Sequence, residues 1–161
     1  MNQKITTKQI VITAAIAGIY FVLAAVFAPL SFGPVQVRIA EIMTLLPILT
    51  PFAIPGTFIG CLIANIIFGE GILDIIFGSI ATLIAAVLTY MLRKNKYLAA
   101  LPPVIVNAFI IAYVLKVSVG APYWMTVFTV GVGQAIACYA LGIPFITLLE
   151  KYLPKDFFES K

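Results

Sequence analysis

Long stretches without any charged residue constrain this sequence more than any other feature. Residues 10–30 form an apolar run that contains no Asp, Glu, Lys or Arg, and similar runs follow along the chain. A helix needs about 20 apolar residues to cross the hydrocarbon core of a bilayer. Because 63% of the 161 residues are hydrophobic and only 10% are charged, a water-soluble domain of this size could not bury them. The chain is therefore predicted to be an integral membrane protein, which excludes a soluble enzyme and a nucleic-acid binder.

Turn residues and one basic cluster divide the chain into apolar segments. The predicted spans are residues 9–30, 35–49, 55–68, 72–92, 99–117 and 123–149. The first run is about twice as long as the apolar part of a signal peptide, so we expect it to be a retained helix. Pro144 is expected to kink the last span. The predicted fold class is an all-α membrane bundle of six helices, with a single domain over residues 1–161.

The distribution of Lys and Arg predicts the orientation of these spans. With the amino terminus in the cytoplasm, eight basic residues lie on the cytoplasmic side: Lys4, Lys8, Arg93, Lys94, Lys96, Lys151, Lys155 and Lys161. Two others, Arg38 and Lys116, lie near outer helix ends. Cytoplasmic segments carry the excess of basic residues in membrane proteins, so both termini are predicted to be cytoplasmic.

This topology gathers the polar residues of the spans in the outer half of the bundle. An ionisable residue at the centre of a membrane costs about 3 kcal/mol on insertion scales and usually faces a bundle interior or a wet cavity. The predicted substrate-binding residues are Arg38, Glu41, Asn65, Glu70, Asp74, Asn107, Tyr113, Trp124 and Gln134. No polar path continues through the inner halves, so the pattern predicts an outward-facing pocket and not a continuous pore.

Structural roles are open to each of these residues as well. Arg38 and Glu41 are three residues apart and can pair on one helix face. Asp74 can stabilise a helix amino terminus, and Glu70 can be solvated in its glycine-flanked turn. The amide side chains can join helices by hydrogen bonds, and the aromatic residues can belong to an interfacial belt.

Charge limits the ligand of such a pocket. The outer half holds one more acidic than basic group, with Glu41, Glu70 and Asp74 against Arg38 and Lys116. A carboxylate can accept two parallel N–H bonds from a guanine-like edge or bind a cation. Asp74 is the first candidate for the carboxylate that binds the ligand, because Gly78 on the same helix face is expected to leave room for a ring. These features alone leave the substrate as a small polar molecule that is not strongly anionic.

The sequence contains no source of energy for transport. It has no G-x-x-x-x-G-K-[ST] phosphate loop and no polar trail for a proton relay. No cofactor or metal is expected, because the chain has no His and no clustered Cys. A partner is therefore predicted, and the pair Ala14 and Gly18 offers small residues for docking of a helix, although packing within the bundle also explains such a pair.

Two motifs resemble a known family. Gln-Val-Arg-Ile-Ala-Glu at residues 36–41 and Asp-Ile-Ile-Phe-Gly-Ser at residues 74–79 are similar to segments of the QueT family of queuosine-precursor transporters. These are S components, the substrate-binding subunits of energy-coupling factor (ECF) transporters. The stretch 65–69, Asn-Ile-Ile-Phe-Gly, fits as well.

The resemblance implies a substrate, partners and a location. The substrate would be an aminomethyl-deazaguanine or a queuine-type deazapurine, bound on the outer side under the loop that joins spans one and two. The partners would be a transmembrane coupling subunit, docked on span one, and two ATPase subunits. The location would be a bacterial plasma membrane. One departure from the family pattern is Gly18, which stands where the docking pair has a second alanine.

Three alternatives stay open at this point. The chain can be an S component for another vitamin, or a self-sufficient homodimeric transporter or channel. A membrane-embedded enzyme is the third, but without His only carboxylates are available as a catalytic base. The chain is therefore expected not to be an enzyme.

Overall fold

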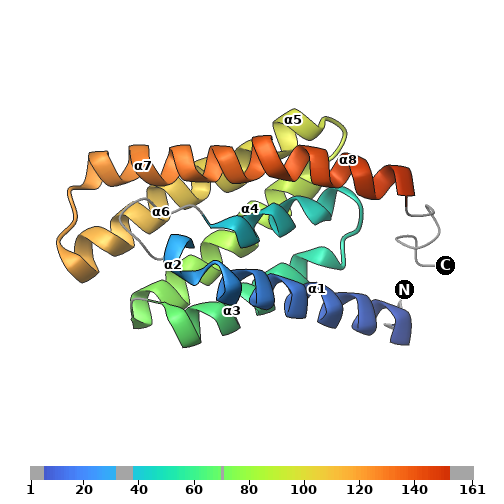
Figure 1. The fold of residues 1–161 in the computed structure, drawn as a ribbon, viewed down its shortest axis with the longest axis horizontal. Helices are drawn as coiled ribbons and strands as arrows, with labels where there is room; N and C mark the ends of the chain where they lie inside the picture. Colours follow the sequence, from blue (N-terminus) through green and yellow to red (C-terminus); the bar gives the residue numbers. More distant parts are fainter. Residues whose placement is uncertain (1–5, 32–37, 70, 153–161) are drawn as a thin grey trace.

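The computed structural model describes residues 6–31, 38–69 and 71–152, and all regular structure within them is helical. The α-helices are α1 (Thr7–Val26), α2 (Ala28–Ser31), α3 (Ala53–Phe68), α4 (Ser79–Met91), α5 (Lys96–Ala99), α6 (Leu101–Val119), α7 (Tyr123–Ala135) and α8 (Ile143–Tyr152) (Figure 1). The other elements are the 3₁₀ helix η1 (Ile39–Ile48) and the π-helical turns η2 (Asp74–Gly78) and η3 (Ile136–Gly142).

Several of the helical segments are long and apolar enough to cross a membrane. They are Thr7–Val26, Asp74–Met91, Lys96–Val119 and Tyr123–Tyr152, and two shorter apolar helices, Ile39–Ile48 and Ala53–Phe68, accompany them. The chain is therefore an all-α, multi-pass membrane protein, as the sequence predicted. The count of six crossings and the cytoplasmic termini stay predictions.

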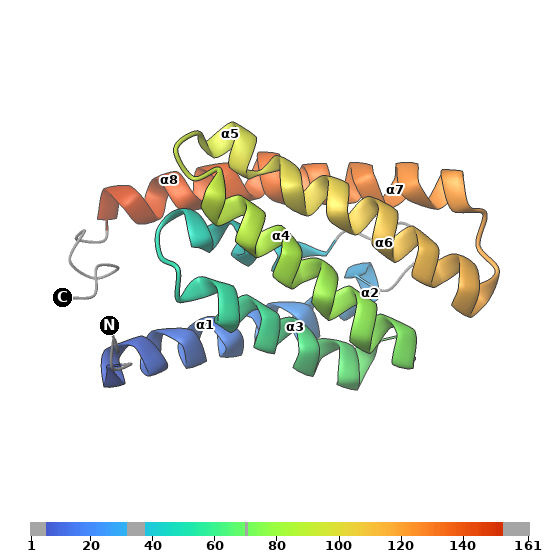
Figure 2. The same cartoon turned by 180° about the vertical axis from the view of Figure 1, so that it is seen from behind.

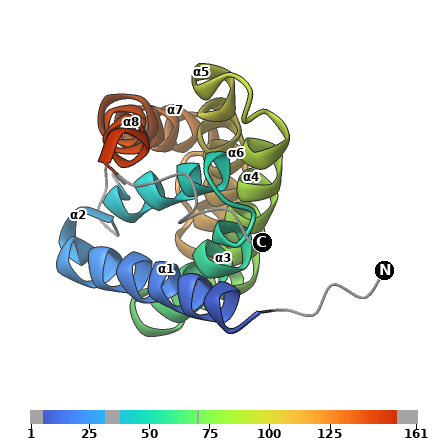
Figure 3. The same ribbon diagram turned by 90° about the vertical axis from the view of Figure 1, so that its right-hand side faces the viewer.

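The short helix η1 lies in the interior of the bundle. Ten residues of 3₁₀ helix extend about 20 Å, which is less than the roughly 30 Å of a hydrocarbon core. In Figures 1 and 3, η1 lies between the pair α1 and α3 on one side and the long helix of α7, η3 and α8 on the other. Non-α backbone is tolerated at membrane depth where protein surrounds it. This burial explains how so short an apolar segment fits into a membrane fold.

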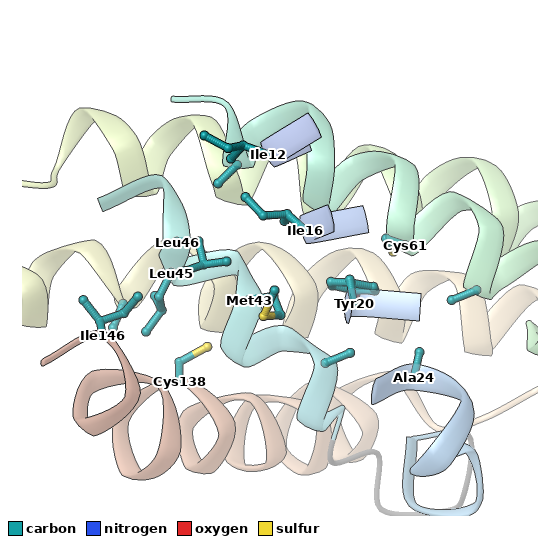
Figure 4. Packing of buried hydrophobic residues seen from close by; sticks show 14 residues of the cluster. Ile12, Ile16, Tyr20, Ala24, Met43, Leu45, Leu46, Cys61, Cys138 and Ile146 are labelled. Carbon is teal, nitrogen blue, oxygen red and sulfur yellow. The ribbon is translucent and has the colours of Figure 1, made fainter. Parts of the chain in front are cut away.

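The apolar core forms around η1 (Figure 4). Met43 and Leu45 of η1 are buried against Ile16 of α1 and, on the opposite side, against Cys138 and Ile146 of the last long helix. Contacts with α4 and α5 complete the enclosure of η1, and Figure 2 shows α4 and α6 covering the bundle from behind. The polar residues of η1 are thereby held inside the bundle.

Helices α1 and α3 pack closely because glycines of α3 face α1. A Cβ atom at Gly60 would lie 2.7 Å from Tyr20 Cβ, and one at Gly56 would lie 2.9 Å from Ile16 Cβ. Both distances are too short for real side chains, so these positions require glycine. This close approach places Tyr20, which is 2% exposed, over α3 and beside η1.

Around Pro144 the structure differs from the expected kink. The π-helical turn η3 directly precedes α8, which contains Pro144. Proline removes a hydrogen-bond donor and clashes with the carbonyl four residues earlier, here that of Ala140 within η3. The wider π-turn accommodates this clash, and Figure 1 shows α7, η3 and α8 following one another without a sharp break.

Candidate functional site

A buried ion pair joins the start of η1 to η2. Arg38 Nη2 lies 3.4 Å from both Asp74 Oδ1 and Asp74 Oδ2, and the two side chains are 7% and 5% exposed. The sequence suggested Arg38 and Glu41 as a pair on one helix face. Arg38 instead precedes η1 in extended backbone, with φ −81° and ψ 92°, so the three-residue spacing along a helix does not apply to it. Its partner is therefore the carboxylate on a different element.

The carboxylate of Asp74 is tightly enclosed. A Cβ atom at Gly78 would lie 2.9 Å from both Asp74 Oδ1 and Asn65 Nδ2, and one at Gly69 would lie 2.8 Å from Asp74 Oδ2. Asn65 Nδ2 donates to the Asp74 backbone oxygen over 3.2 Å. The expectation that Gly78 leaves room for a ring is therefore wrong for this structure, because Asn65 and Asp74 themselves occupy that space.

A second set of polar contacts connects α3 with α4. Thr82 Oγ1 donates to Gly78 O and lies 3.2 Å from both this oxygen and Cys61 Sγ. Asn65 Nδ2 lies 3.5 Å from Cys61 Sγ. The predicted substrate-binding residues did not include Cys61 or Thr82. Their position one helical turn from Asn65 and Gly78 was the available signal, because residues four apart share a helix face.

The carboxylate of Glu41 lies inside the bundle with no exposed surface. Its Oε1 accepts a hydrogen bond from Tyr20 Oη over 2.8 Å, and Thr44 Oγ1 donates to the Glu41 backbone oxygen over 2.6 Å. The side chain of Asn107 on α6 also approaches it. Sequence reasoning missed Tyr20. The signal was a phenol within an apolar span, because a buried tyrosine hydroxyl usually finds a polar partner.

Several buried polar atoms on η1, α3, α4, α6 and α7, which we call the buried cluster, lack a hydrogen-bond partner within the described part of the chain. They are Glu41 Oε2, Asn65 Oδ1, Ser79 Oγ, Asn107 Nδ2 and Gln134 Oε1, all in side chains that are at most 2% exposed. A buried polar atom without a partner costs about 1–3 kcal/mol, so folded proteins contain few of them. Together these atoms offer both donors and acceptors to a small polar molecule.

Tyr113 and Trp124, two of the predicted site residues, do not join the cluster. Tyr113 is 58% exposed and Trp124 is 74% exposed. Six residues separate Tyr113 from Asn107, which turns it about 240° around α6, away from the face that Asn107 presents to the interior. Exposed aromatic residues on membrane helices fit the interfacial belt better than a ring pocket. Glu70 and the segment 32–37 lie outside the described residues.

The predicted docking residues Ala14 and Gly18 lie on the outer surface of α1. Both line an apolar groove of about 690 Å³ between α1 and the start of α3. Its other lining residues are Gln9, Ile10, Thr13, Ala17, Phe21, Phe52, Pro55, Ile59 and Ile63. A Cβ atom at Gly18 would have no atom within 4 Å. The small residues therefore leave space on a face that the rest of the described chain does not cover.

Comparison with known proteins gives one decisive match. The sequence model of a family described as QueT transporter matches residues 10–151. The chain belongs to the QueT transporter family. This confirms the resemblance based on the segments at residues 36–41 and 74–79, and a transporter family fits the expectation that the chain is not an enzyme. No match was found among curated proteins or among solved structures.

Proposed function

We propose that this QueT family member is the substrate-binding S component of an ECF-type importer, and that its substrate is a queuosine precursor. The substrate is a deazaguanine with an aminomethyl group, or a related queuine-type base. The buried cluster around Glu41, Asp74, Asn107 and Gln134 is the binding site. The observation that carries this proposal is the set of unpartnered donors and acceptors in that cluster, because each of them gains a partner when a polar ligand binds.

The charge of the cluster suits such a ligand. Glu41 and Asp74 face a single guanidinium, that of Arg38, and all three residues are buried. A carboxylate in excess inside a membrane protein is costly unless it meets a donor-rich or cationic group. A deazaguanine supplies ring N–H groups, and its aminomethyl substituent supplies an ammonium.

Partners provide the energy in this proposal. The sequence has no phosphate loop, so a transmembrane coupling subunit and two ATPase subunits drive the import. The groove that contains Ala14 and Gly18 is the docking face for the coupling subunit. Small residues allow helix backbones to approach closely within a membrane, which supports this assignment.

Thermal unfolding of the purified chain in detergent tests the proposal. A ligand at a hundred times its Kd stabilises the folded state by about 2.7 kcal/mol, so aminomethyl-deazaguanine and queuine are expected to raise Tm. Thiamine, riboflavin and biotin are expected to leave it unchanged. A shift with one of these vitamins alone would make the chain an S component for that vitamin. Uptake by the chain alone in vesicles, without ATP, would instead indicate a self-sufficient transporter.

A further inference from the structure

We propose that Glu41 and Asn107 together read the hydrogen-bonding edge of the ring, and that Asp74 does not contact this edge. Oε2 of Glu41 accepts from both the ring N–H and the exocyclic amino group, and the Asn107 amide donates to the neighbouring ring carbonyl. This inference rests on the proposed function and assigns the part of the site that gives specificity.

The carboxylate of Asp74 already has a charged partner. Both of its carboxylate oxygens lie 3.4 Å from Arg38 Nη2. A Cβ atom at position 69 would lie 2.8 Å from Oδ2 and one at position 78 would lie 2.9 Å from Oδ1, so the chain itself fills both sides of this carboxylate. A ring placed against this carboxylate would have to displace the ion pair and Asn65. Of the two buried carboxylates among the described residues, Asp74 is paired with Arg38, so Glu41 is the one that remains available to a ligand.

Glu41 presents one oxygen in a fixed direction. Tyr20 Oη donates to Oε1 over 2.8 Å, whereas Oε2 has no partner within the described part of the chain. The hydroxyl of Tyr20 has a single proton, so this bond holds the carboxylate in one orientation and leaves Oε2 as an acceptor. A carboxylate held in this way bonds N–H groups more strongly than a neutral acceptor does.

Asn107 supplies a donor beside this acceptor. Its side chain approaches Glu41, is 2% exposed, and carries a partnerless Nδ2 within the described residues. An acceptor next to a donor matches a ring edge on which N–H and C=O are adjacent. A guanine-type edge has this order, whereas an adenine-type edge has no carbonyl.

Ligand analogues combined with variants test the assignment. We would measure the Kd of the full chain in detergent by titration calorimetry, for deazaguanine and for deazahypoxanthine, which lacks the exocyclic amino group. The wild-type chain is expected to bind deazaguanine at least tenfold more tightly. Glu41→Gln is expected to lose about thirtyfold or more in affinity for deazaguanine and to discriminate less than threefold between the two ligands. Glu150→Gln, a carboxylate variant outside the site, should behave as wild type.

Asn107→Asp tests the carbonyl contact by a change of preference. Replacing the amide donor by an acceptor should weaken deazaguanine binding and narrow the preference over deaza-2,6-diaminopurine, in which an amino group replaces the ring carbonyl and the adjacent ring nitrogen carries no hydrogen. A gain in affinity for one ligand relative to the other cannot arise from misfolding. The Asn107→Asp variant therefore tests the inference even where Glu41→Gln fails to fold.

Two sets of results separate the failure of this inference from that of the proposed function. Wild-type chain that binds deazaguanine but shows no preference over deazahypoxanthine overturns the inference and leaves the function intact. The inference is also overturned, and the function left intact, if Glu41→Gln and Asn107→Asp both keep the ligand preferences of the wild-type chain. Wild-type chain that binds neither ring overturns the proposed function, and the inference with it.

Discussion

At the residue scale, two ion pairs within the described residues differ in their surroundings. The side chains of Arg38 and Asp74 are 7% and 5% exposed, whereas those of Lys96 and Glu150 are 32% and 37% exposed. Removing one partner of a buried pair leaves an uncompensated charge and costs about 3–5 kcal/mol. Surface pairs contribute about 0–1 kcal/mol. The burial of each ion pair thus decides how much it contributes to the stability of the fold.

Asp74→Asn is therefore expected to lower Tm by several degrees or more, because the buried Arg38 guanidinium loses the charge of the carboxylate that it contacts. Glu150→Gln is the matched control and should change Tm by no more than a degree or two. Thermal unfolding of the full chain in detergent, followed by size-exclusion chromatography, measures both variants. Equal Tm values for the two would mean that the Arg38–Asp74 pair does not contribute to stability.

Tyr20 is a positioning residue in our account, since it acts on the ligand through Glu41. Tyr20→Phe removes the hydroxyl that holds Glu41 Oε1 and should lower the affinity for deazaguanine about tenfold, because a hydrogen bond to a charged group contributes about 1.5–3 kcal/mol. It should also narrow the discrimination against deazahypoxanthine, which a purely structural role would leave unchanged. Tyr139→Phe, which removes a hydroxyl bonded to Tyr97 O, is the matched control. Calorimetric titration with both ligands measures the two effects.

The sequence predicted the members of the polar cluster better than their contacts. Polar residues in apolar spans are costly unless they face an interior, and this argument identified Glu41, Asn107 and Gln134, each at most 2% exposed. It did not predict the partner of Arg38, because that residue lies in extended backbone before η1. Nor did it exclude Trp124, because an aromatic residue can face either lipid or a ring pocket.

At the element scale, the approach of α1 to α3 depends on Gly60. A Cβ atom there would lie 2.7 Å from Tyr20 Cβ and 2.8 Å from the Ala17 backbone oxygen, so α1 would have to move. Overpacking of this kind costs about 1–3 kcal/mol, and Gly60→Ala should lower Tm and weaken the hydrogen bond between Tyr20 and Glu41.

Gly131 on α7 provides the control for this substitution. A Cβ atom there would lie 3.6 Å from Ala108 Cβ, which is ordinary contact, and alanine favours a helix over glycine by up to about 1 kcal/mol. Gly131→Ala is therefore expected to leave Tm unchanged or to raise it. Thermal unfolding of both variants would contradict our view of the α1–α3 contact if Gly60→Ala were as stable as Gly131→Ala.

Helix ends were more predictable than helix types. The break at Gly69 and the end of α6 at Gly120, where φ is 73°, follow from turn chemistry that sequence displays directly. The 3₁₀ and π segments η1, η2 and η3 did not follow from the sequence, because hydropathy reports which residues avoid water and not the local helical pitch. Their pitch depends on packing inside the bundle, as the burial of η1 illustrates.

At the scale of the whole molecule, the predicted orientation can be tested through cysteine labelling. The natural cysteines Cys61 and Cys138 are 1% and 0% exposed, so they should react slowly and leave a low background. Lys94→Cys, in the basic loop, should be protected from a membrane-impermeant maleimide in intact cells. Ser118→Cys, at the exposed far end of α6, should be labelled. The reverse pattern would invert the orientation that the distribution of Lys and Arg predicts.

Helix α1 connects the two sites that transport requires in our proposal. Ala14 and Gly18 line its outer groove, while Ile16 and Tyr20 on the opposite side are buried in the core, where Tyr20 bonds Glu41. In this proposal a single helix contacts both the coupling subunit and Glu41. Substitutions on its two faces should therefore affect different steps.

Ala14→Leu and Gly18→Leu fill the groove, so both are expected to prevent assembly with the coupling subunit and to reduce ATP-dependent uptake at least tenfold. The Kd for deazaguanine should stay within twofold of wild type, because neither side chain points towards Glu41. Ala15→Leu adds the same bulk to an exposed position of α1 outside the groove and should assemble normally. Co-purification and uptake assays measure assembly and transport, and calorimetry measures binding. Normal uptake in both groove variants would place the docking face elsewhere on the bundle, whereas loss of deazaguanine binding would show that the two faces of α1 are not independent.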